Sequence, residues 1–138
     1  MTHVVHPYSF RLGYTRNWRS RWFSSRKYKE FLKSDILTRE YLEKKLRGMS
    51  VESVDIERTA DVFHLIIKTA RPGLVIGRKG EGVENLKREI IRILRKEKLE
   101  LSREFKLSVE EVPHPDAKAS IIAQMIAENL EKQLPFKR

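Results

Sequence analysis

Hydrophobic residues recur at helical spacing between Ser25 and Gly48. The intervals between them run through three, four and one residues, which places them on one face of a helix. These residues are Tyr28, Phe31, Leu32, Ile36, Leu37, Tyr41, Leu42 and Leu46. Because Ser25 is a suitable cap and Gly48 a suitable stop, we predict one long helix here, with this face turned toward a core.

A two-residue alternation replaces the helical spacing further along the chain. Hydrophobic and acidic residues alternate over residues 54–57, residues 59–61 (Thr-Ala-Asp) favour a short turn, and residues 62–69 are rich in β-branched side chains. Residues 51–58 and 62–69 are therefore predicted to form a β-hairpin. His64 is expected only to occupy a strand position.

A second long helix is predicted after a glycine-containing loop. Residues 71–73 (Arg-Pro-Gly) end the second strand, residues 74–76 offer one apolar turn, and the GRKG stretch of residues 77–80 follows. Beyond this stretch the hydrophobic positions again have helical spacing: Val83, Leu86, Ile90, Ile93 and Leu94. Acidic residues at its beginning and basic residues at its end suit the helix dipole.

The last third of the chain predicts a third strand and a final helix. After a charged connector, Phe105, Leu107 and Val109 alternate with polar residues as in a strand, and a His-Pro-Asp turn follows. The final helix carries an apolar stripe that we expect to face inward: Ala119, Ile122, Ala123, Ile126, Ala127, Leu130 and Leu134.

The charge of the chain indicates a polyanionic partner. The 138 residues include 29 Lys and Arg against 19 Asp and Glu, a formal net charge of +10. Since basic residues bind phosphates by displacing condensed counterions, nucleic acid is the leading partner class and an anionic membrane surface the second. No apolar run approaches the roughly 20 residues that span a bilayer, and the first residues do not resemble a signal peptide. We expect an intracellular protein with no membrane partner.

Most of the positive charge lies near the amino terminus. Residues 1–34 carry eight basic residues against Glu30 alone, and aromatic residues are interleaved with them. Arginine and aromatic side chains both stack on unpaired bases, and arginine also binds phosphate. The RNA-binding residues predicted in this stretch are Arg11, Arg16, Trp18, Arg19, Arg21, Trp22, Arg26 and Lys27. The alternative is a disordered basic arm that binds any anion.

The GRKG stretch is the second predicted RNA-binding feature. Gly77 and Gly80 allow backbone conformations and close approaches that a Cβ would obstruct, while Arg78 and Lys79 supply positive charge. The helix that follows offers free N–H groups to a phosphate. Residues 74–76, together with the second strand, could wall a groove for unpaired bases, or they could be core.

Few residues remain for catalysis. The absence of cysteine excludes disulfides, thiolate metal sites and cysteine nucleophiles. No P-loop spacing is present, and Asn85 stands where a dinucleotide-binding motif needs its third glycine. His3 and His6 have no nearby carboxylate and are followed by Pro7, which disfavours a metal site or a general base. We predict no enzyme activity, no catalytic residue, no metal and no cofactor.

The order of elements and the VIGRKGEGVENL stretch of residues 75–86 resemble the prokaryotic-type, or type II, KH domain. This resemblance implies an α+β fold with a three-stranded mixed sheet and helices packed on one face, preceded here by the basic aromatic arm. We divide the chain into an arm (residues 1–24), a KH core (25–112) and a carboxy-terminal helix with a basic end (113–138).

A second resemblance covers essentially the whole chain. Residues 6–13 (HPYSFRLG) and 18–23 (WRSRWF) are similar to the amino-terminal signature of the universal uS three family of small-subunit ribosomal proteins. Residues 56–58, 69–73 and 126–129 also resemble that family at the expected places.

The resemblance to the ribosomal family implies partners and a location. These are ribosomal RNA, neighbouring proteins of the small-subunit head, and mRNA near the path by which it enters, in cytoplasmic small subunits of a bacterium or in an organelle. Lys137 and Arg138 match family residues that face incoming mRNA, and the family continues into a second domain that this sequence does not contain. The alternative is a stand-alone KH module of a ribosome-assembly or transcription factor, which would not begin with the two amino-terminal stretches.

Overall fold

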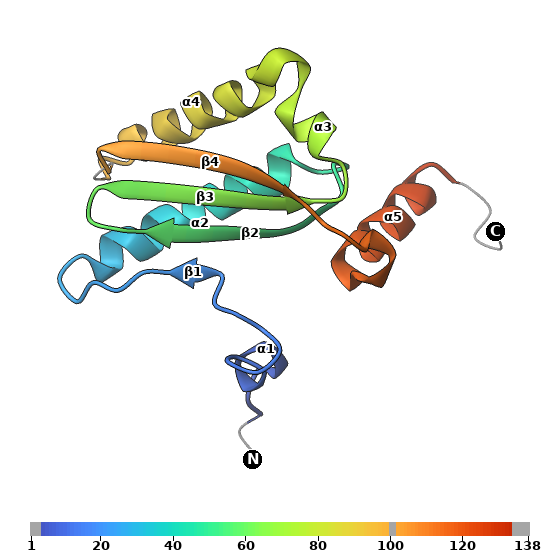
Figure 1. Ribbon diagram of the computed structural model, residues 1–138, viewed down its shortest axis with the longest axis horizontal. Helices are drawn as coiled ribbons and strands as arrows, with labels where there is room; N and C mark the ends of the chain where they lie inside the picture. The colour runs from blue at the N-terminus through green and yellow to red at the C-terminus, as the bar shows by residue number, and fades with distance from the viewer. Residues whose placement is uncertain (1–3, 100–101, 134–138) are drawn as a thin grey trace.

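The structure is a computed structural model that describes residues 4–99 and 102–133 of the chain (Figure 1). In chain order its elements are α1 (Pro7–Phe10), β1 (Ser20–Arg21), α2 (Tyr28–Lys45), β2 (Val51–Arg58), β3 (Val62–Thr69), α3 (Pro72–Ile76), the 3₁₀ turn η1 (Arg78–Gly80), α4 (Glu81–Lys96), β4 (Glu104–Glu111), the 3₁₀ turn η2 (Pro115–Ala117) and α5 (Ala119–Glu131). The α+β fold class predicted from the sequence is confirmed.

The strands form one mixed sheet in the order β1-β2-β3-β4. β2 and β3 are antiparallel, with Ile56 opposite Leu65, and their bounds are those predicted for the hairpin. β4 runs parallel to β3, a connection that requires a crossover, which α3 and α4 supply. The sheet has four strands rather than the predicted three because β1, a strand of two residues from the arm, pairs in parallel with β2.

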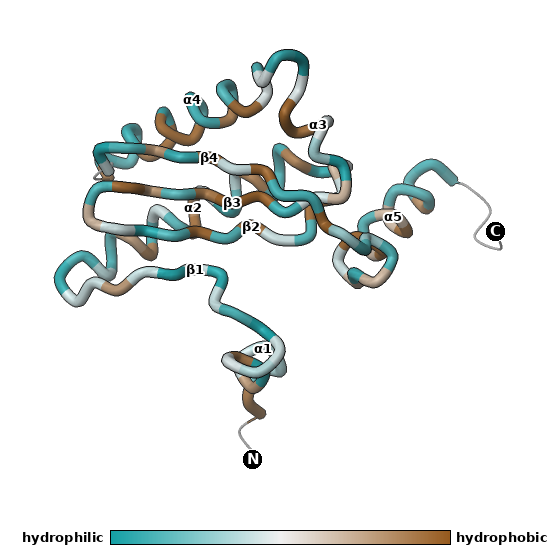
Figure 2. The backbone as a smooth tube through the Cα atoms, viewed as in Figure 1, coloured by the Kyte–Doolittle hydropathy of each residue, from teal (hydrophilic) through white to brown (hydrophobic). Residues whose placement is uncertain are grey.

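The core lies between the sheet and two long helices. α2 and α4 cover the same face of the sheet and contact each other (Figure 1). The buried cluster draws on both helices, on α3 and on inward-facing strand positions: Leu42, Leu46, Ile56, Phe63, Leu65, Ile67, Val75, Leu86, Ile90, Leu94 and Phe105. Hydrophobic positions along β3 and on α4 stand out in Figure 2, in agreement with the stripe predicted for the second long helix.

The first half of α2 buries a different face from the one that the hydrophobic spacing predicts, whereas Leu42 and Leu46 of the predicted stripe are buried in the core. Three residues of the predicted stripe are exposed: Tyr28, Leu32 and Ile36. The positions buried in their place are polar: Ser34, Asp35 and Thr38. The buried Asp35 pairs with Arg58 of β2, whose side chain is also buried. The helix also begins later than predicted, with Lys27 rather than Ser25 at the N-cap position.

α5 does not face inward along its predicted stripe. Several large apolar side chains on it are exposed: Ile122, Met125, Ile126 and Leu130. Ile121 is the buried residue of this helix within the described chain, and the Gln124 side chain donates a hydrogen bond to the Val51 carbonyl of β2 at 2.7 Å. The inward-facing residues Ile121 and Gln124 are therefore not members of the predicted stripe. Leu134, the last member of that stripe, lies outside the described residues.

The described part of the arm folds back on itself before it reaches the sheet. His6 caps α1 by accepting a hydrogen bond from the Tyr8 N–H at 3.1 Å. The Tyr8 hydroxyl donates to the Asn17 carbonyl at 2.6 Å, and a bridge joins Leu12 and Arg16. The arm then enters β1, so its last residues belong to the same sheet as the rest of the fold.

Candidate nucleic-acid interface

The loop at residues 77–80 joins α3 to α4 at the end of the sheet where α3 begins (Figure 1). Pro72 begins α3, and the Gly77 N–H closes it with a hydrogen bond to the Gly73 carbonyl at 3.0 Å. Proline at the first turn and glycine after the last turn are the usual boundaries of a short helix. Pro72 and Gly77 therefore set where α3 begins and ends, and so where the loop before α4 begins.

Three residues of this loop have left-handed backbone conformations. The φ angles are 71° at Gly77, 54° at Lys79 and 81° at Gly80. Glycine adopts such angles freely, whereas for lysine the conformation costs on the order of 1 kcal/mol. A Cβ on Gly77 would also lie 3.1 Å from the backbone nitrogen of Gly82. The loop thus needs its two glycines, and Lys79 is held with its side chain outward at a small energetic cost.

The loop presents two cations that form no ion pair with a carboxylate of the described chain. Arg78 and Lys79 are exposed, and neither forms an ion pair within residues 4–99 and 102–133. The first turn of α4 begins beside them, and Gly80 at its N-cap offers no side-chain cap to the free N–H groups. Two cations and a helix amino terminus in one exposed loop are suited to a backbone phosphate.

Gly82 has a role in this loop that the sequence prediction missed. A Cβ at this position would meet the carbonyl oxygens of Val75 and Ile76 at 2.5 Å and 2.8 Å. Only glycine lets the first turn of α4 pass so closely over the end of α3. In the sequence, Gly82 is visible as a third glycine two residues after Gly80. Spacing alone, however, does not distinguish a glycine needed for helix packing from one needed for phosphate binding.

The side chains of α3 divide between core and surface. Val75 is 2% exposed, whereas Leu74 and Ile76 are 55% and 38% exposed. Val75 is therefore core, and the other two remain available to a ligand. Both α3 and α4 contact β4, which the crossover places beside them.

Trp22 and Arg21, two of the RNA-binding residues predicted in the arm, point to opposite faces of the sheet, Trp22 toward α2 and Arg21 toward the open face. The Ser20 hydroxyl and the Trp22 indole N–H both donate to Asp35 Oδ2, at 2.9 Å and 2.8 Å, and the Trp22 ring packs edge-on against Phe31. Burial lowers the pKa of Arg58, the cation that faces Asp35, and the attraction of Asp35 opposes this fall. Trp22 thus has a structural position in the fold; its role in RNA binding stays a prediction.

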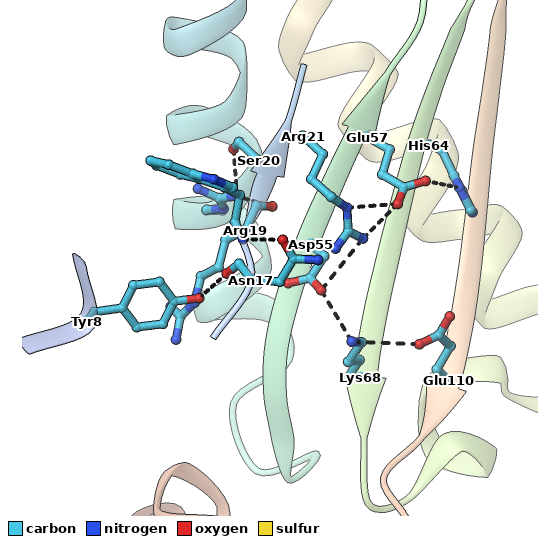
Figure 3. A network of polar contacts seen from close by, with 12 residues as sticks. Tyr8, Asn17, Arg19, Ser20, Arg21, Asp55, Glu57, His64, Lys68 and Glu110 are labelled. Carbon is cyan, nitrogen blue, oxygen red and sulfur yellow. Dashed lines mark hydrogen bonds and ion pairs between the residues drawn. The ribbon is translucent and has the colours of Figure 1, made fainter. Parts of the chain in front are cut away.

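Arg21 points to the open face of the sheet, where it enters a network of ion pairs (Figure 3). Its guanidinium lies 2.7 Å from Glu57 and 3.9 Å from Asp55. Lys68 continues the network to Asp55 at 3.3 Å, and His64 lies 3.4 Å from Glu57. Because carboxylates compensate the positive charge here, this face has less free charge than the loop or the beginning of the arm.

The other predicted arm residues are exposed. Arg26 and Lys27 are exposed between β1 and α2, and Trp18 is 63% exposed. The exposed arginines of the arm lie close to Tyr8: Arg11, Arg16 and Arg19. Lys137 and Arg138 lie outside the described residues.

Within residues 4–99 and 102–133 no group of three or more His, Asp or Glu side chains is placed to hold a metal ion. None of the described helices is both long enough and apolar enough to cross a membrane.

The fold and the glycine loop define a class of RNA-binding proteins. Residues 37–117 match the KH domain family, and the chain belongs to that family. The match runs from the middle of α2 to η2 and includes the loop between α3 and α4.

More particular relatives are similar along the whole chain. All 138 residues align with small ribosomal subunit protein uS3 of Maridesulfovibrio salexigens at 43% identity and with that of Lawsonia intracellularis at 44%. The chloroplast-type relative of Chlorokybus atmophyticus, small ribosomal subunit protein uS3c, is 39% identical. The chain spans 62% of the length of each of these relatives. The resemblance seen in the sequence is therefore confirmed.

Proposed function

We propose that the chain is a non-enzymatic RNA-binding constituent of the small ribosomal subunit, and that it binds ribosomal RNA through the loop at residues 77–80 and the amino-terminal arm. The observation that carries this proposal is the full-length similarity to small ribosomal subunit protein uS3, combined with a KH loop whose two cations have no carboxylate partner in the described chain. An exposed, positively charged loop at a helix amino terminus suits a sugar-phosphate backbone rather than a base edge.

The arm is proposed to contribute stacking and phosphate contacts beyond the loop. Trp18 and the nearby arginines are exposed and can reach unpaired bases, whereas Trp22 and Arg21 are also engaged within the fold. We keep the division into arm, KH core and carboxy-terminal segment as part of the proposal, with β1 as the point where the arm joins the core.

Ribosome association is the direct test. The tagged chain would be expressed in a bacterial host, and small subunits would be separated on sucrose gradients at two salt concentrations. We expect the chain in the small-subunit fractions at both. Recovery only in the free fraction at low salt would contradict the proposal.

The loop is tested by changing its charges rather than its glycines. Arg78→Asp together with Lys79→Asp keeps Gly77 and Gly80, and aspartate tolerates the left-handed conformation of position 79. We expect this variant to bind RNA more weakly and to be depleted from small subunits. The control is Lys29→Asp with Lys44→Asp, which makes the same change of net charge on exposed positions of α2. Equal losses in both variants would assign the effect to net charge and not to the loop.

Finer assignments of place belong to the same proposal. The chain would lie in the head of the small subunit beside neighbouring proteins, near the path by which mRNA enters, in the cytoplasm or in an organelle. Lys137 and Arg138 would face mRNA. Site-directed crosslinking from these two positions to a bound message, compared with crosslinking from Arg103, would test this placement.

A stand-alone KH module is the second candidate function. The same loop chemistry would serve a ribosome-assembly or transcription factor, and the KH match by itself does not separate the two. The observation against it is that the similarity extends through the arm and α5, beyond residues 37–117.

A further inference from the structure

α5 carries an apolar face that the rest of the described chain leaves exposed. Six residues at helical spacing share one side of this helix, which we call the outer face: Ala119, Ile122, Ala123, Ile126, Ala127 and Leu130. All six are exposed, and the polar residues of the helix lie outside this face. A continuous apolar surface of this kind marks a site of interaction with another molecule.

The opposite side of α5 is fixed to the rest of the fold. Ile121 is buried, the Gln124 side chain donates to the Val51 carbonyl at 2.7 Å, and Arg47 forms an ion pair with Glu131. Nine residues separate Ile121 from Leu130, which is half a turn around a helix. These contacts therefore hold the outer face away from the sheet, beyond whose end α5 lies (Figure 1).

The outer face is complementary to itself in an antiparallel arrangement. When two copies of the helix pack in opposite directions about a twofold axis between Gln124 and Met125, each alanine of one outer face stands level with a large residue of the other. The level pairs are Ala119 with Leu130, Ala123 with Ile126, and Ala127 with Ile122. Large residues opposite small ones let facing helices interdigitate without gaps.

The charges at the two ends of α5 favour the same direction. Lys118 stands directly before the helix and Glu131 is its last residue, and both side chains are partly exposed. The antiparallel arrangement brings Lys118 of each copy level with Glu131 of the other, whereas a parallel arrangement would place like charges together. Because each group already has a partner in its own chain, these charges select the direction of the pair and add little to its strength.

We propose that the outer face of α5 binds the outer face of a second copy of this chain, as an antiparallel pair of helices related by a twofold axis. Twofold dimers use one patch on both copies, which a self-complementary face provides. A pair of 13-residue helices is smaller than a standard interface, so we expect a dissociation constant on the order of micromolar or weaker. The inference is independent of the proposed function, because no RNA contact enters it.

Sedimentation equilibrium of the nuclease-treated full chain tests for the dimer. We expect a monomer–dimer equilibrium that shifts toward the dimer as salt rises, since salt screens the repulsion between two chains of net charge +10. A chain that stays monomeric up to millimolar concentration would overturn the inference. So would association that weakens as salt rises, because that contact would be held by charge and not by the apolar face.

Substitutions on the outer face test its packing. Ile126→Lys, at a position that is 54% exposed, should weaken the dimer at least tenfold, whereas the control Ile36→Lys makes the same change on α2, at a position that is 47% exposed, and should leave it unchanged. Ala123→Leu adds apolar area but fills the space that Ile126 of the other copy needs, so it should also weaken the dimer. Stronger association of Ala123→Leu would indicate a non-specific apolar patch and would overturn the inference.

Introduced cysteines test the direction of the helices, because the chain has no cysteine of its own. In the antiparallel pair the two copies of position 123 lie about 4.5 Å apart along the helix axes, and the two copies of position 119 about 16 Å apart. Ala123→Cys should therefore form a disulfide-linked dimer under mild oxidation. Ala119→Cys should do so only when it is mixed with Leu130→Cys. A disulfide-linked dimer of Ala119→Cys alone, in the same yield as that of Ala123→Cys, would refute the antiparallel pair.

A competing occupant is tested in the same experiment. This chain spans 62% of the Maridesulfovibrio salexigens relative, and the unaligned part of that relative can be added as a separate polypeptide. If this polypeptide binds the parent chain but not Ile126→Lys, and the chain alone stays monomeric, the outer face takes another domain and the inference fails. Because RNA plays no part in this contact, that result would leave the proposed function standing.

Discussion

Asp35 of α2 and Arg58 of β2 form an ion pair whose two side chains are only 2% and 4% exposed, with Nη2 of the arginine 2.7 Å from Oδ1 of the aspartate. The guanidinium also lies over the Phe63 ring at 4.0 Å, and its other partner is the Ser34 hydroxyl. A buried charge is tolerated only when its hydrogen bonds are satisfied, and Asp35 receives hydrogen bonds at both oxygens. The pair therefore joins α2, the sheet and the end of the arm.

Removing the charge of Asp35 should destabilise the whole fold. Asp35→Asn keeps the shape of the side chain but leaves Arg58 buried without a counter-charge, which costs about 3 to 5 kcal/mol of unfolding free energy. Urea unfolding followed by circular dichroism measures this loss.

The control for Asp35 is an ion pair on the surface. Lys33 donates a hydrogen bond to Glu97 at 2.7 Å, and this hydrogen bond holds the pKa of Glu97 below its usual value. A lowered carboxyl pKa stabilises the fold above the unfolded-state pKa, and this contribution is lost as the pH falls through the folded-state pKa. Because the pair is exposed, Glu97→Gln should leave the urea midpoint nearly unchanged at neutral pH. A midpoint shift as large as that of Asp35→Asn would contradict the special role of the buried pair.

Variants of Trp18 and Trp22 should distinguish a role in RNA binding from a role in the stability of the fold. Trp22→Phe removes the indole N–H donor to Asp35 and should cost about 1 to 3 kcal/mol of unfolding free energy. Trp18→Phe, at a position that is 63% exposed, should not change the unfolding midpoint. Trp18→Ala should instead weaken oligonucleotide binding by about 1 to 3 kcal/mol if the ring stacks on a base. Loss of stability in both phenylalanine variants would argue against this division of roles.

Gly82 and Gly73 offer a matched pair of glycine substitutions. Gly82→Ala forces a methyl group against the carbonyl oxygens of Val75 and Ile76 and should cost about 1 to 3 kcal/mol. Gly73→Ala meets no atom within 4 Å and should be neutral or slightly stabilising. Differential scanning calorimetry on both variants provides the test, and equal melting temperatures would refute the close contact between α3 and α4.

Truncations of the arm should differ according to where they end. Removal of residues 1–17 takes away α1 and leaves β1, so urea unfolding should be unchanged. Removal of residues 1–24 also takes away Ser20 and Trp22, two donors to the buried Asp35, and should lower stability measurably. Both truncations should reduce co-sedimentation with small subunits. Salt-resistant co-sedimentation of the chain that lacks residues 1–17 would show that α1 and the exposed arginines Arg11 and Arg16 are dispensable for association with the small subunit.

The hairpin, the second long helix and the glycine loop were predictable because their signals are local. Alternation over residues 54–57 and a run rich in β-branched residues over 62–69 predict the two strands of the hairpin, and the apolar stripe of α4 matches the face that it buries. Glycine at positions 77 and 80 permits the left-handed angles that the loop adopts there. Similarity to known relatives supports the same reading of the whole chain.

The sequence by itself determined where the two long helices, the hairpin, β4 and α5 form, where the KH loop lies and that the arm is basic, since each depends on residues that are neighbours in the chain. Only the tertiary structure decided that α2 turns Asp35 inward, that α5 buries Ile121 rather than Ile122, and that the arm supplies a fourth strand. The tertiary structure also decided which arginines form ion pairs. Arg21 pairs with Glu57 and Arg58 with Asp35, which lie 36 and 23 positions away in the sequence. Whether a polar or charged side chain is buried depends on partners that folding brings to it, and no local pattern records them.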